Sequence, residues 1–256
     1  MKRFFAMLLL AAVFCTFLAG CTVSKRTEET TEIPAAPEPE RERDENGQFV
    51  FDVPEVMNGL YCSPGLDFAN SEDVEGSDYV NCVILSAYAQ DDLAGQIRLA
   101  IKNGNAFWIS TQFLERGIVK DKWGKRYMAI AEDWQSEMDK VVATVRDEGA
   151  FNYFLGFYMD EPLFNRFSVK NIYDFSKYNH DTFGKRYFIC FAVEGIVPSE
   201  YNDGVTNGHM TKKYSTYITD AAYDMYWDFE TYKDKYERIN EKMKLELPDD
   251  CRIWYI

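Results

Sequence analysis

The stretch GFYMDEP, residues Gly156 to Pro162, joins an apolar run to two adjacent carboxylates and a proline. Together with the residues FNYFL before it, the run is long and aromatic enough to predict a buried β-strand over residues 151–159. Two interpretations fit its polar end. Asp160 and Glu161 form a functional pair at the end of a strand, or Asp160 caps the next helix and Pro162 lies in its first turn.

Outward from this stretch, strand-like and helix-like segments alternate along the chain. The predicted strands cover residues 57–62, 78–89, 106–111, 151–159, 186–193, 221–227 and 251–256. The predicted helices cover residues 93–104, 127–149, 168–178, about 211–217, and 232–243. Near-continuous apolar strands separated by amphipathic helices predict a parallel sheet covered by helices.

The later strands recur about every 30 residues, the pitch of a (β/α)8 TIM barrel. We count seven strands, and the sequence stops inside the seventh. The expectation is therefore an α/β barrel that is C-terminally truncated in or after its seventh strand; the alternative is that the fold is not a barrel. If the side chains alternate regularly, Leu155, Phe157 and Met159 line the barrel interior below Glu161.

The N-terminus predicts export. Lys2 and Arg3 precede an uncharged apolar run that ends in LAGC, at Leu18 to Cys21. This layout is typical of a signal peptide over residues 1–20, and the run is short for a transmembrane anchor, which is the alternative. LAGC resembles the bacterial lipobox, which implies lipid attachment at Cys21 and an extracytoplasmic protein anchored to a bacterial membrane.

The composition changes twice after the signal peptide. Residues 21–48 are rich in Glu, Thr, Pro and Arg, which predicts a disordered tether behind the lipidated Cys21. The barrel is expected over residues 49–256, beginning at Phe49. The formal net charge of −14 argues against a nucleic-acid partner and against adhesion to anionic lipid by charge.

Two segments carry a family resemblance. GFYMDEP resembles the fourth-strand motif of glycoside-hydrolase-like TIM barrels, and YDMYWDF, residues 223–229, resembles their sixth-strand segment. The resemblance implies that Glu161 is the general acid/base, that Asp160 is its polar neighbour, and that Tyr226 faces the sugar. The better-known motif has Asn where this chain has Asp160. Its usual nucleophile, a Glu at the end of the seventh strand, falls after Ile256.

Other residues complete the predicted site. Hydrolysis of a glycosidic bond needs a second carboxylate, and Glu194 and Asp228 are the candidates after the fifth and sixth strands. Gln112 is a candidate hydrogen-bond partner for a sugar hydroxyl, and Trp254 a candidate stacking platform. No cofactor is implied, and the two histidines are too isolated to predict a metal site.

The sequence thus predicts an exported lipoprotein that hydrolyses glycosidic bonds of a carbohydrate with Glu161 as general acid/base. The alternative is a non-catalytic carbohydrate-binding lipoprotein on the same barrel. A two-lobed solute-binding lipoprotein is a third hypothesis, which the steady recurrence of strand and helix units disfavours.

Overall fold

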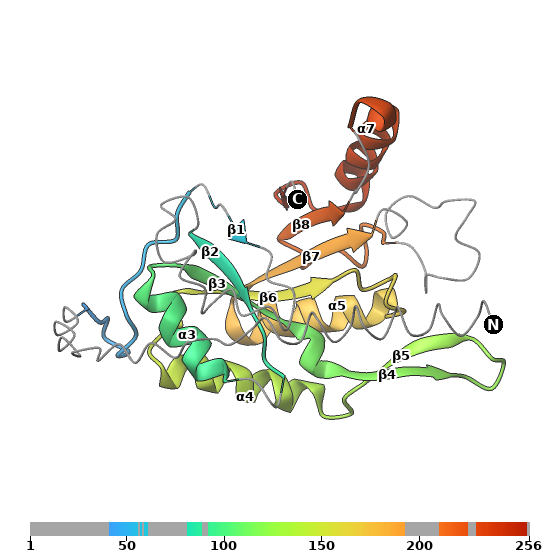
Figure 1. The fold of residues 1–256 in the computed structure, drawn as a ribbon. Coiled ribbons are helices and arrows are strands. Elements are labelled where there is room, and N and C mark those ends of the chain that lie inside the picture. The colour runs from blue at the N-terminus through green and yellow to red at the C-terminus, as the bar shows by residue number, and fades with distance from the viewer. Residues whose placement is uncertain are drawn as a thin grey trace, which may run out of the picture. The chain divides into compact units, whose positions relative to one another are not determined.

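A seven-stranded parallel sheet forms the centre of the fold (Figure 1). The computed structural model describes residues 41–55, 57, 59–60, 81–88, 92–192, 210–224 and 229–254. The strands, in sheet order, are β1 (Gly59–Leu60), β2 (Cys82–Leu85), β3 (Ala106–Ser110), β6 (Phe154–Asp160), β7 (Arg186–Ala192), β8 (Asp220–Asp224) and β9 (Arg252–Ile253). Every neighbouring pair is parallel and follows the chain order. This is the strand order of a (β/α) barrel, and within the described residues β1 and β9 do not pair to close it.

The connecting helices have clear sequence boundaries. They are α3 (Leu93–Lys102), α4 (Trp134–Asp147), α5 (Val169–Tyr178) and α7 (Phe229–Glu246). Asp92 caps α3 by accepting a hydrogen bond from the Gly95 N–H, and Gly149, with a φ of 72°, follows the end of α4. The predicted α/β class and the predicted helices at 93–104, 168–178 and 232–243 are confirmed.

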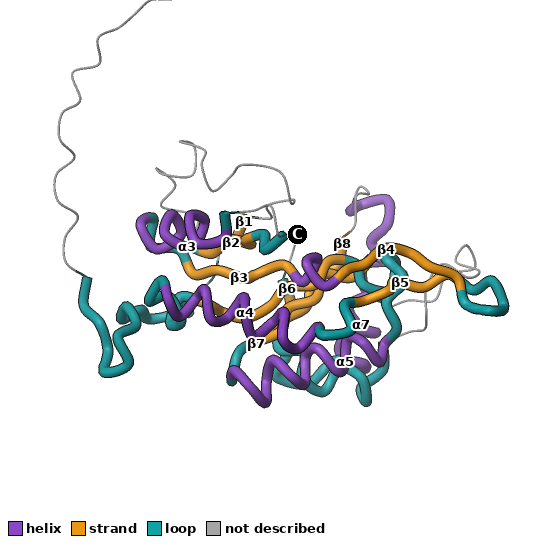
Figure 2. Tube along the Cα trace, turned by 90° about the horizontal axis from the view of Figure 1, so that it is seen from below, coloured by secondary structure: helices purple, strands orange, loops and turns teal. Residues whose placement is uncertain are grey.

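The two faces of the sheet have different partners (Figure 2). One face packs against the helices: Phe157, Ile189 and Ala221 share a hydrophobic cluster with buried residues of α3, α4, α5 and α7. The other face holds a second cluster, to which the described helices contribute no residue. Its members are Cys82, Ile84, Ala106, Trp108, Leu155, Tyr158, Phe188, Cys190 and Ala222. This second cluster corresponds to a barrel interior.

The expected helix over residues 127–149 is wrong in its first part. An antiparallel hairpin is inserted between β3 and α4, with strands β4 (Glu115–Lys120) and β5 (Arg126–Ile130). Met128 and Ile130 reach the hydrophobic core from β5, where they alternate, and α4 begins only at Trp134. Their spacing in sequence fits both a strand and a helix, which is why the helix prediction extended too far upstream. The expected short helix near residues 211–217 is likewise wrong, because that segment forms turns.

The folded part also begins before Phe49, where the tether was expected to end. The Asn152 Nδ2 donates to Asp44 Oδ2 at 2.9 Å, and the Phe151 N–H donates to Gln48 Oε1 at 3.0 Å. Arg43 and Phe49 form an antiparallel β-bridge. Residues 41–48 are therefore part of the folded domain, while Cys21 and the predicted signal peptide lie outside the described residues. No helix in the described part of the chain is long and apolar enough to cross a membrane.

A β-bulge at Gly156 changes which side chains of β6 face inward. Phe107 pairs with Phe154, but the next residue, Trp108, pairs with Gly156. A shift of one residue turns every later side chain to the opposite face. The expectation that Phe157 and Met159 line the interior is therefore wrong: both pack against the helices, whereas Tyr158 belongs to the inner cluster.

Candidate active site at the carboxyl ends of β3 and β6

Asp160 is the inward-facing carboxylate at the end of β6. It is the register partner of Cys190, which belongs to the inner cluster, and paired residues of neighbouring strands share a face. The Tyr158 O–H, two residues back on the same face, donates to Asp160 Oδ1 at 2.9 Å. The amide Nδ2 of Asn165 donates to the Asp160 carbonyl at 3.1 Å. The bulge at Gly156 therefore turns both Asp160 and Tyr158 inward, so that the Tyr158 hydroxyl can hold the Asp160 carboxylate.

Glu161 leaves the strand in an unusual backbone conformation. Its φ is 36°, in the left-handed region that non-glycine residues rarely adopt. The Glu161 N–H still donates to the Cys190 carbonyl at 2.9 Å, so the backbone stays attached to β7. Strain of this kind, which costs about 1–3 kcal/mol, is common at functional sites.

The helix-cap interpretation of Asp160 is wrong. Residues 162–166 form turns, and α5 does not begin until Val169. Ser168 caps that helix in a capping box with Asn171. Asp160 and Pro162 consequently do not start a helix, and the carboxylates need another explanation.

The end of β3 brings a second set of polar groups to the same edge of the sheet. The Thr111 Oγ1 donates to the Tyr158 carbonyl at 3.2 Å, which ties the short 3₁₀ helix η2 (Thr111–Leu114) to β6. Gln112, a predicted site residue, lies on this turn. Its Oε1 is buried and accepts no hydrogen bond from any residue that the structure describes. A buried acceptor without a donor is uncommon.

Glu115 is a site residue that the sequence analysis missed. It follows η2 directly, at the start of β4. Burial, and second the negative charge of Asp160, raise the pKa of Glu115 to about 7. A carboxyl group whose pKa lies near neutral beside a second carboxylate is an arrangement that suits acid catalysis. The only sequence signal for it is a Glu a few residues beyond the end of a predicted strand.

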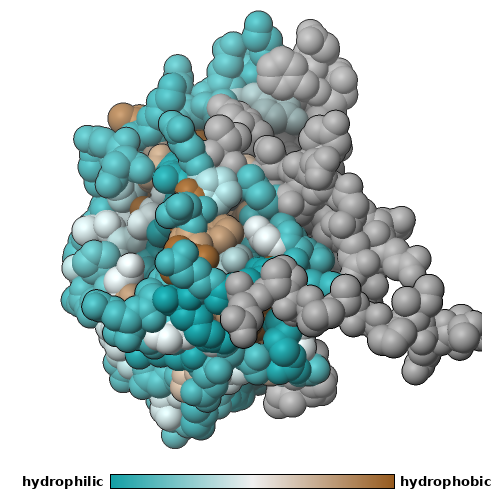
Figure 3. Space-filling view, turned by 90° about the vertical axis from the view of Figure 1, so that its left-hand side faces the viewer, coloured by the Kyte–Doolittle hydropathy of each residue, from teal (hydrophilic) through white to brown (hydrophobic). Residues whose placement is uncertain are grey.

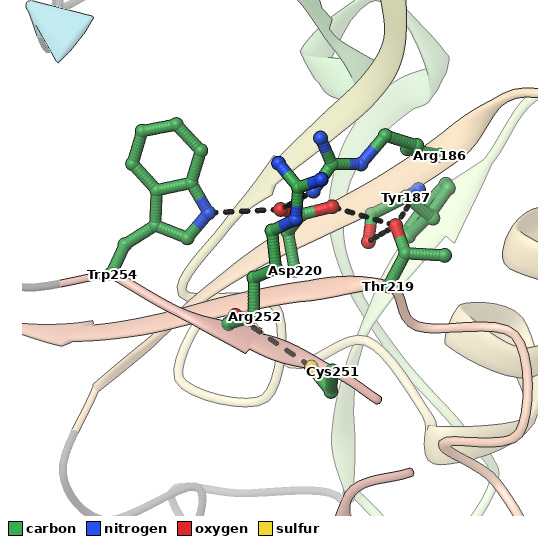
Figure 4. Close-up of polar contacts among 7 residues, drawn as sticks. All are labelled: Arg186, Tyr187, Thr219, Asp220, Cys251, Arg252 and Trp254. Carbon is green, nitrogen blue, oxygen red and sulfur yellow. Dashed lines mark hydrogen bonds and ion pairs between the residues drawn. The ribbon is translucent and has the colours of Figure 1, made fainter. Parts of the chain in front are cut away.

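Trp254 packs in the interior through two contacts, and Figure 4 shows the one with Asp220. Its indole N–H donates to Asp220 Oδ1 at 2.9 Å, and its ring stacks on Phe188 with centroids 5.1 Å apart. Asp220 also forms an ion pair with Arg186 and accepts a 2.7 Å hydrogen bond from the Thr219 hydroxyl. The indole N–H is therefore already used inside the protein, and sugar binding by Trp254 stays a prediction.

Three further predicted site residues, Glu194, Tyr226 and Asp228, lie outside the described residues. The structure brings together Gln112, Glu115 and Asp160 on one edge of the sheet, with Glu161 next along the chain. The described residues include no group of three or more His, Cys, Asp or Glu side chains that could hold a metal ion.

Comparisons with known proteins identify no family for the chain. No protein-family model matches it, and neither does any curated protein. Among solved structures, a chitinase from Chromobacterium violaceum ATCC 12472 is similar with a TM-score of 0.45 and 12% identity, over 78% of this chain and 67% of the chitinase chain. The glycoside hydrolase domain of PelA from Pseudomonas aeruginosa is similar with a TM-score of 0.38 and 13% identity, over 75% of this chain and 79% of that domain. These likenesses are distant and concern the arrangement of strands and helices only.

Proposed function

We propose that this protein hydrolyses glycosidic bonds, with its reacting carboxylates at the carboxyl ends of β3 and β6. The observation that carries the proposal is the placement of the half-buried Glu115 beside Asp160, where burial and the charge of Asp160 raise the pKa of Glu115 to about 7. Glycosidases use one carboxylic acid to protonate the leaving oxygen and one carboxylate on the other side of the reaction. The fourth-strand resemblance of GFYMDEP supports the same reaction class.

In this mechanism the protonated Glu115 gives its proton to the glycosidic oxygen as the bond to the anomeric carbon breaks. A water molecule then adds to the anomeric carbon and gives a proton back to Glu115, which completes the hydrolysis. Asp160, held by the Tyr158 hydroxyl, supplies the negative charge that stabilises the positively charged sugar ring in the transition state. Gln112, on the turn η2 after β3, is the proposed hydrogen-bond partner of a sugar hydroxyl. Glu161, which the resemblance makes the general acid/base, is the competing proton donor.

Single substitutions test these roles. We expect Glu115→Gln and Asp160→Asn to lower kcat/KM on 4-nitrophenyl glycosides or oligosaccharides by about 10²–10⁴-fold. The control Glu132→Gln, an exposed position, should leave it unchanged. If Glu161→Gln abolishes turnover while Glu115→Gln does not, the donor is Glu161. If a broad panel of glycosides binds without any turnover, the protein is the non-catalytic carbohydrate-binding alternative.

We also propose that the protein is exported and anchored to a bacterial membrane through lipid on Cys21. The support is the LAGC sequence after a short apolar run with two basic residues before it. Mass spectrometry of the protein from a bacterial membrane fraction should find a diacylglyceryl group on Cys21 and no residues before it. A Cys21→Ala protein that keeps residues 1–20 would agree with this, and an unmodified wild-type Cys21 would contradict it.

A further inference from the structure

The β4–β5 hairpin concentrates exposed apolar side chains. The described residues expose eight large hydrophobic side chains, and four of them are on this hairpin: Ile118, Val119, Trp123 and Tyr127. Trp123, in the turn, is 79% exposed. By contrast, the coloured part of the side seen in Figure 3 is largely hydrophilic, with small hydrophobic spots scattered over it, mainly near the centre. Exposed apolar residues gathered on one element mark an interaction surface.

The turn of the same hairpin is positively charged, although the protein as a whole is negatively charged. Residues 120–126 have the sequence KDKWGKR, with four cationic side chains and one carboxylate, in a chain of net charge −14. That carboxylate, Asp121, is bound to the backbone of the turn: its Oδ1 accepts hydrogen bonds from the Trp123 and Lys125 N–H groups at 2.8 and 2.9 Å. Among the described residues, Lys122 and Lys125 form no ion pair. The Asp121 side chain thus holds the conformation of the turn, and the lysines of the turn can interact with an anionic partner.

The hairpin extends away from the rest of the sheet in both backbone views (Figures 1 and 2). Its strands of five and six residues reach roughly 15–20 Å at about 3.3 Å per residue. That distance exceeds the Debye length of about 8–10 Å at physiological salt, so the acidic body does not cancel the charge of the turn. The base is fixed, since the Met128 N–H donates to the Arg166 carbonyl at 3.0 Å and the Ala131 N–H to the Leu114 carbonyl at 2.9 Å.

We propose that the turn of this hairpin, residues 120–127, docks on an anionic phospholipid surface. Trp123 and Tyr127 lie in the interface, and Lys120, Lys122 and Lys125 contact the head groups. Aromatic residues are enriched at membrane interfaces, and basic side chains add attraction to anionic lipids. The overall charge opposes adhesion of the body, but the projecting turn presents the opposite sign.

Two observations favour lipid over an anionic polysaccharide. Ile118 pairs with Met128 and Val119 with Tyr127, so exposed apolar side chains occur on both faces of the two-stranded ribbon. An element that enters an interface tip-first needs apolar residues on both faces, whereas a sugar platform needs one flat face. In addition, the Lys122 ammonium lies 4.2 Å from the Trp123 ring centroid and covers one side of the ring on which a sugar would stack.

Quenching of Trp123 fluorescence by lipids with brominated acyl chains tests the proposal in the full-length chain. The contribution of Trp123 is the fluorescence quenching of the wild type minus that of Trp123→Phe. Because the apolar N-terminal segment is present in both proteins, its effect on the quenching cancels. We expect this signal to be quenched at least about threefold more by vesicles with 30% phosphatidylglycerol than by pure phosphatidylcholine vesicles. Lys122→Glu/Lys125→Glu should abolish the difference.

The matched control is Lys233→Glu/Lys244→Glu, which makes the same charge change at two exposed positions of α7. It should be quenched like the wild type. Equal quenching of the wild type and the Lys122→Glu/Lys125→Glu protein, or no quenching of Trp123, would overturn the proposal. So would a result in which the hairpin substitutions reduce retention on an acidic polysaccharide but not the response to vesicles, since the partner would then be a glycan.

Discussion

Gly156 is the residue on which the candidate site depends. Its φ is +146°, and a Cβ added there would lie 1.8 Å from the Arg186 carbonyl oxygen. No other residue type fits this position without moving β7. The bulge that Gly156 permits turns Tyr158 and Asp160 inward, so a backbone feature selects which carboxylate reaches the interior.

Substituting Gly156 tests this directly. We expect Gly156→Ala to lower the free energy of unfolding by about 3 kcal/mol, because it adds both a clash and an unfavourable φ. Gly184→Ala is the control, since its φ is +63° but no atom lies within 4 Å of the added Cβ. It should cost only about 1 kcal/mol. Urea denaturation measures both, and equal losses would mean that the close approach to β7 does not matter.

Some residues of the candidate site could be predicted from the sequence, and others could not. GFYMDEP correctly marked Asp160 and Glu161 as lying at a strand end, and Gln112 was placed beside them. Regular alternation along the strand then predicted that Phe157 and Met159 face inward, which is wrong. The bulge depends on how β6 pairs with β3, and the sequence of β6 alone does not show it. Glu115 was missed for a similar reason: its raised pKa comes from burial and from Asp160, 45 positions later in the printed sequence.

At the scale of elements, apolar runs and capping residues predicted the strands and three helices well. The β4–β5 hairpin was missed because Met128 and Ile130 happen to continue the apolar spacing of α4 upstream of Trp134. Ser168 shows the opposite case. The predicted helix over residues 168–178 begins at this residue, and in the structure Ser168 caps it, with the reciprocal bond to Asn171 that makes a capping box.

Removal of this cap should weaken α5 selectively. We expect Ser168→Ala to cost about 1 kcal/mol of unfolding free energy, since the Asn171 N–H loses its acceptor. Ser168→Asp, which keeps an acceptor at the same position, should cost much less. Hydrogen exchange of the first turn of α5 measures the effect locally. Equal exchange rates in the wild type and Ser168→Ala would show that tertiary packing alone holds the helix start.

At the scale of the molecule, buried polar contacts join the last three strands of the sheet. Asp220, at the start of β8, is fully buried and contacts Arg186 of β7 and Trp254 after β9 (Figure 4). Burial raises the pKa of Asp220, and Arg186 opposes that rise. The long spacing of these residues in sequence explains why the network was not predicted.

Arg186→Met should therefore be strongly destabilising at neutral pH. It removes the cation that is paired with a buried carboxylate and leaves only the charge of Arg252 near Asp220, and breaking such a pair typically costs about 3–5 kcal/mol. Without Arg186, the pKa of Asp220 in the folded state rises further above its value in the unfolded chain. As the pH rises, the Asp220 carboxyl group therefore ionises first in the unfolded chain, which favours unfolding. The cost of Arg186→Met should consequently be smaller at pH 4 than at pH 7.5. Urea titrations at both values measure it, and a cost independent of pH would show that Asp220 is not the group involved.

The proposed function depends on the raised pKa of Glu115 beside the negative charge of Asp160. The most direct measurement is the ¹³C NMR titration of the Glu115 carboxyl carbon, assigned with Glu115→Gln, in the wild type and in Asp160→Asn. The structure predicts a Glu115 pKa of about 7 in the wild type and a clearly lower value in Asp160→Asn, because the second cause of the rise is removed while burial remains. A Glu115 pKa near its ordinary 4.5 in the wild type, or one that Asp160→Asn does not change, would contradict the proposed function.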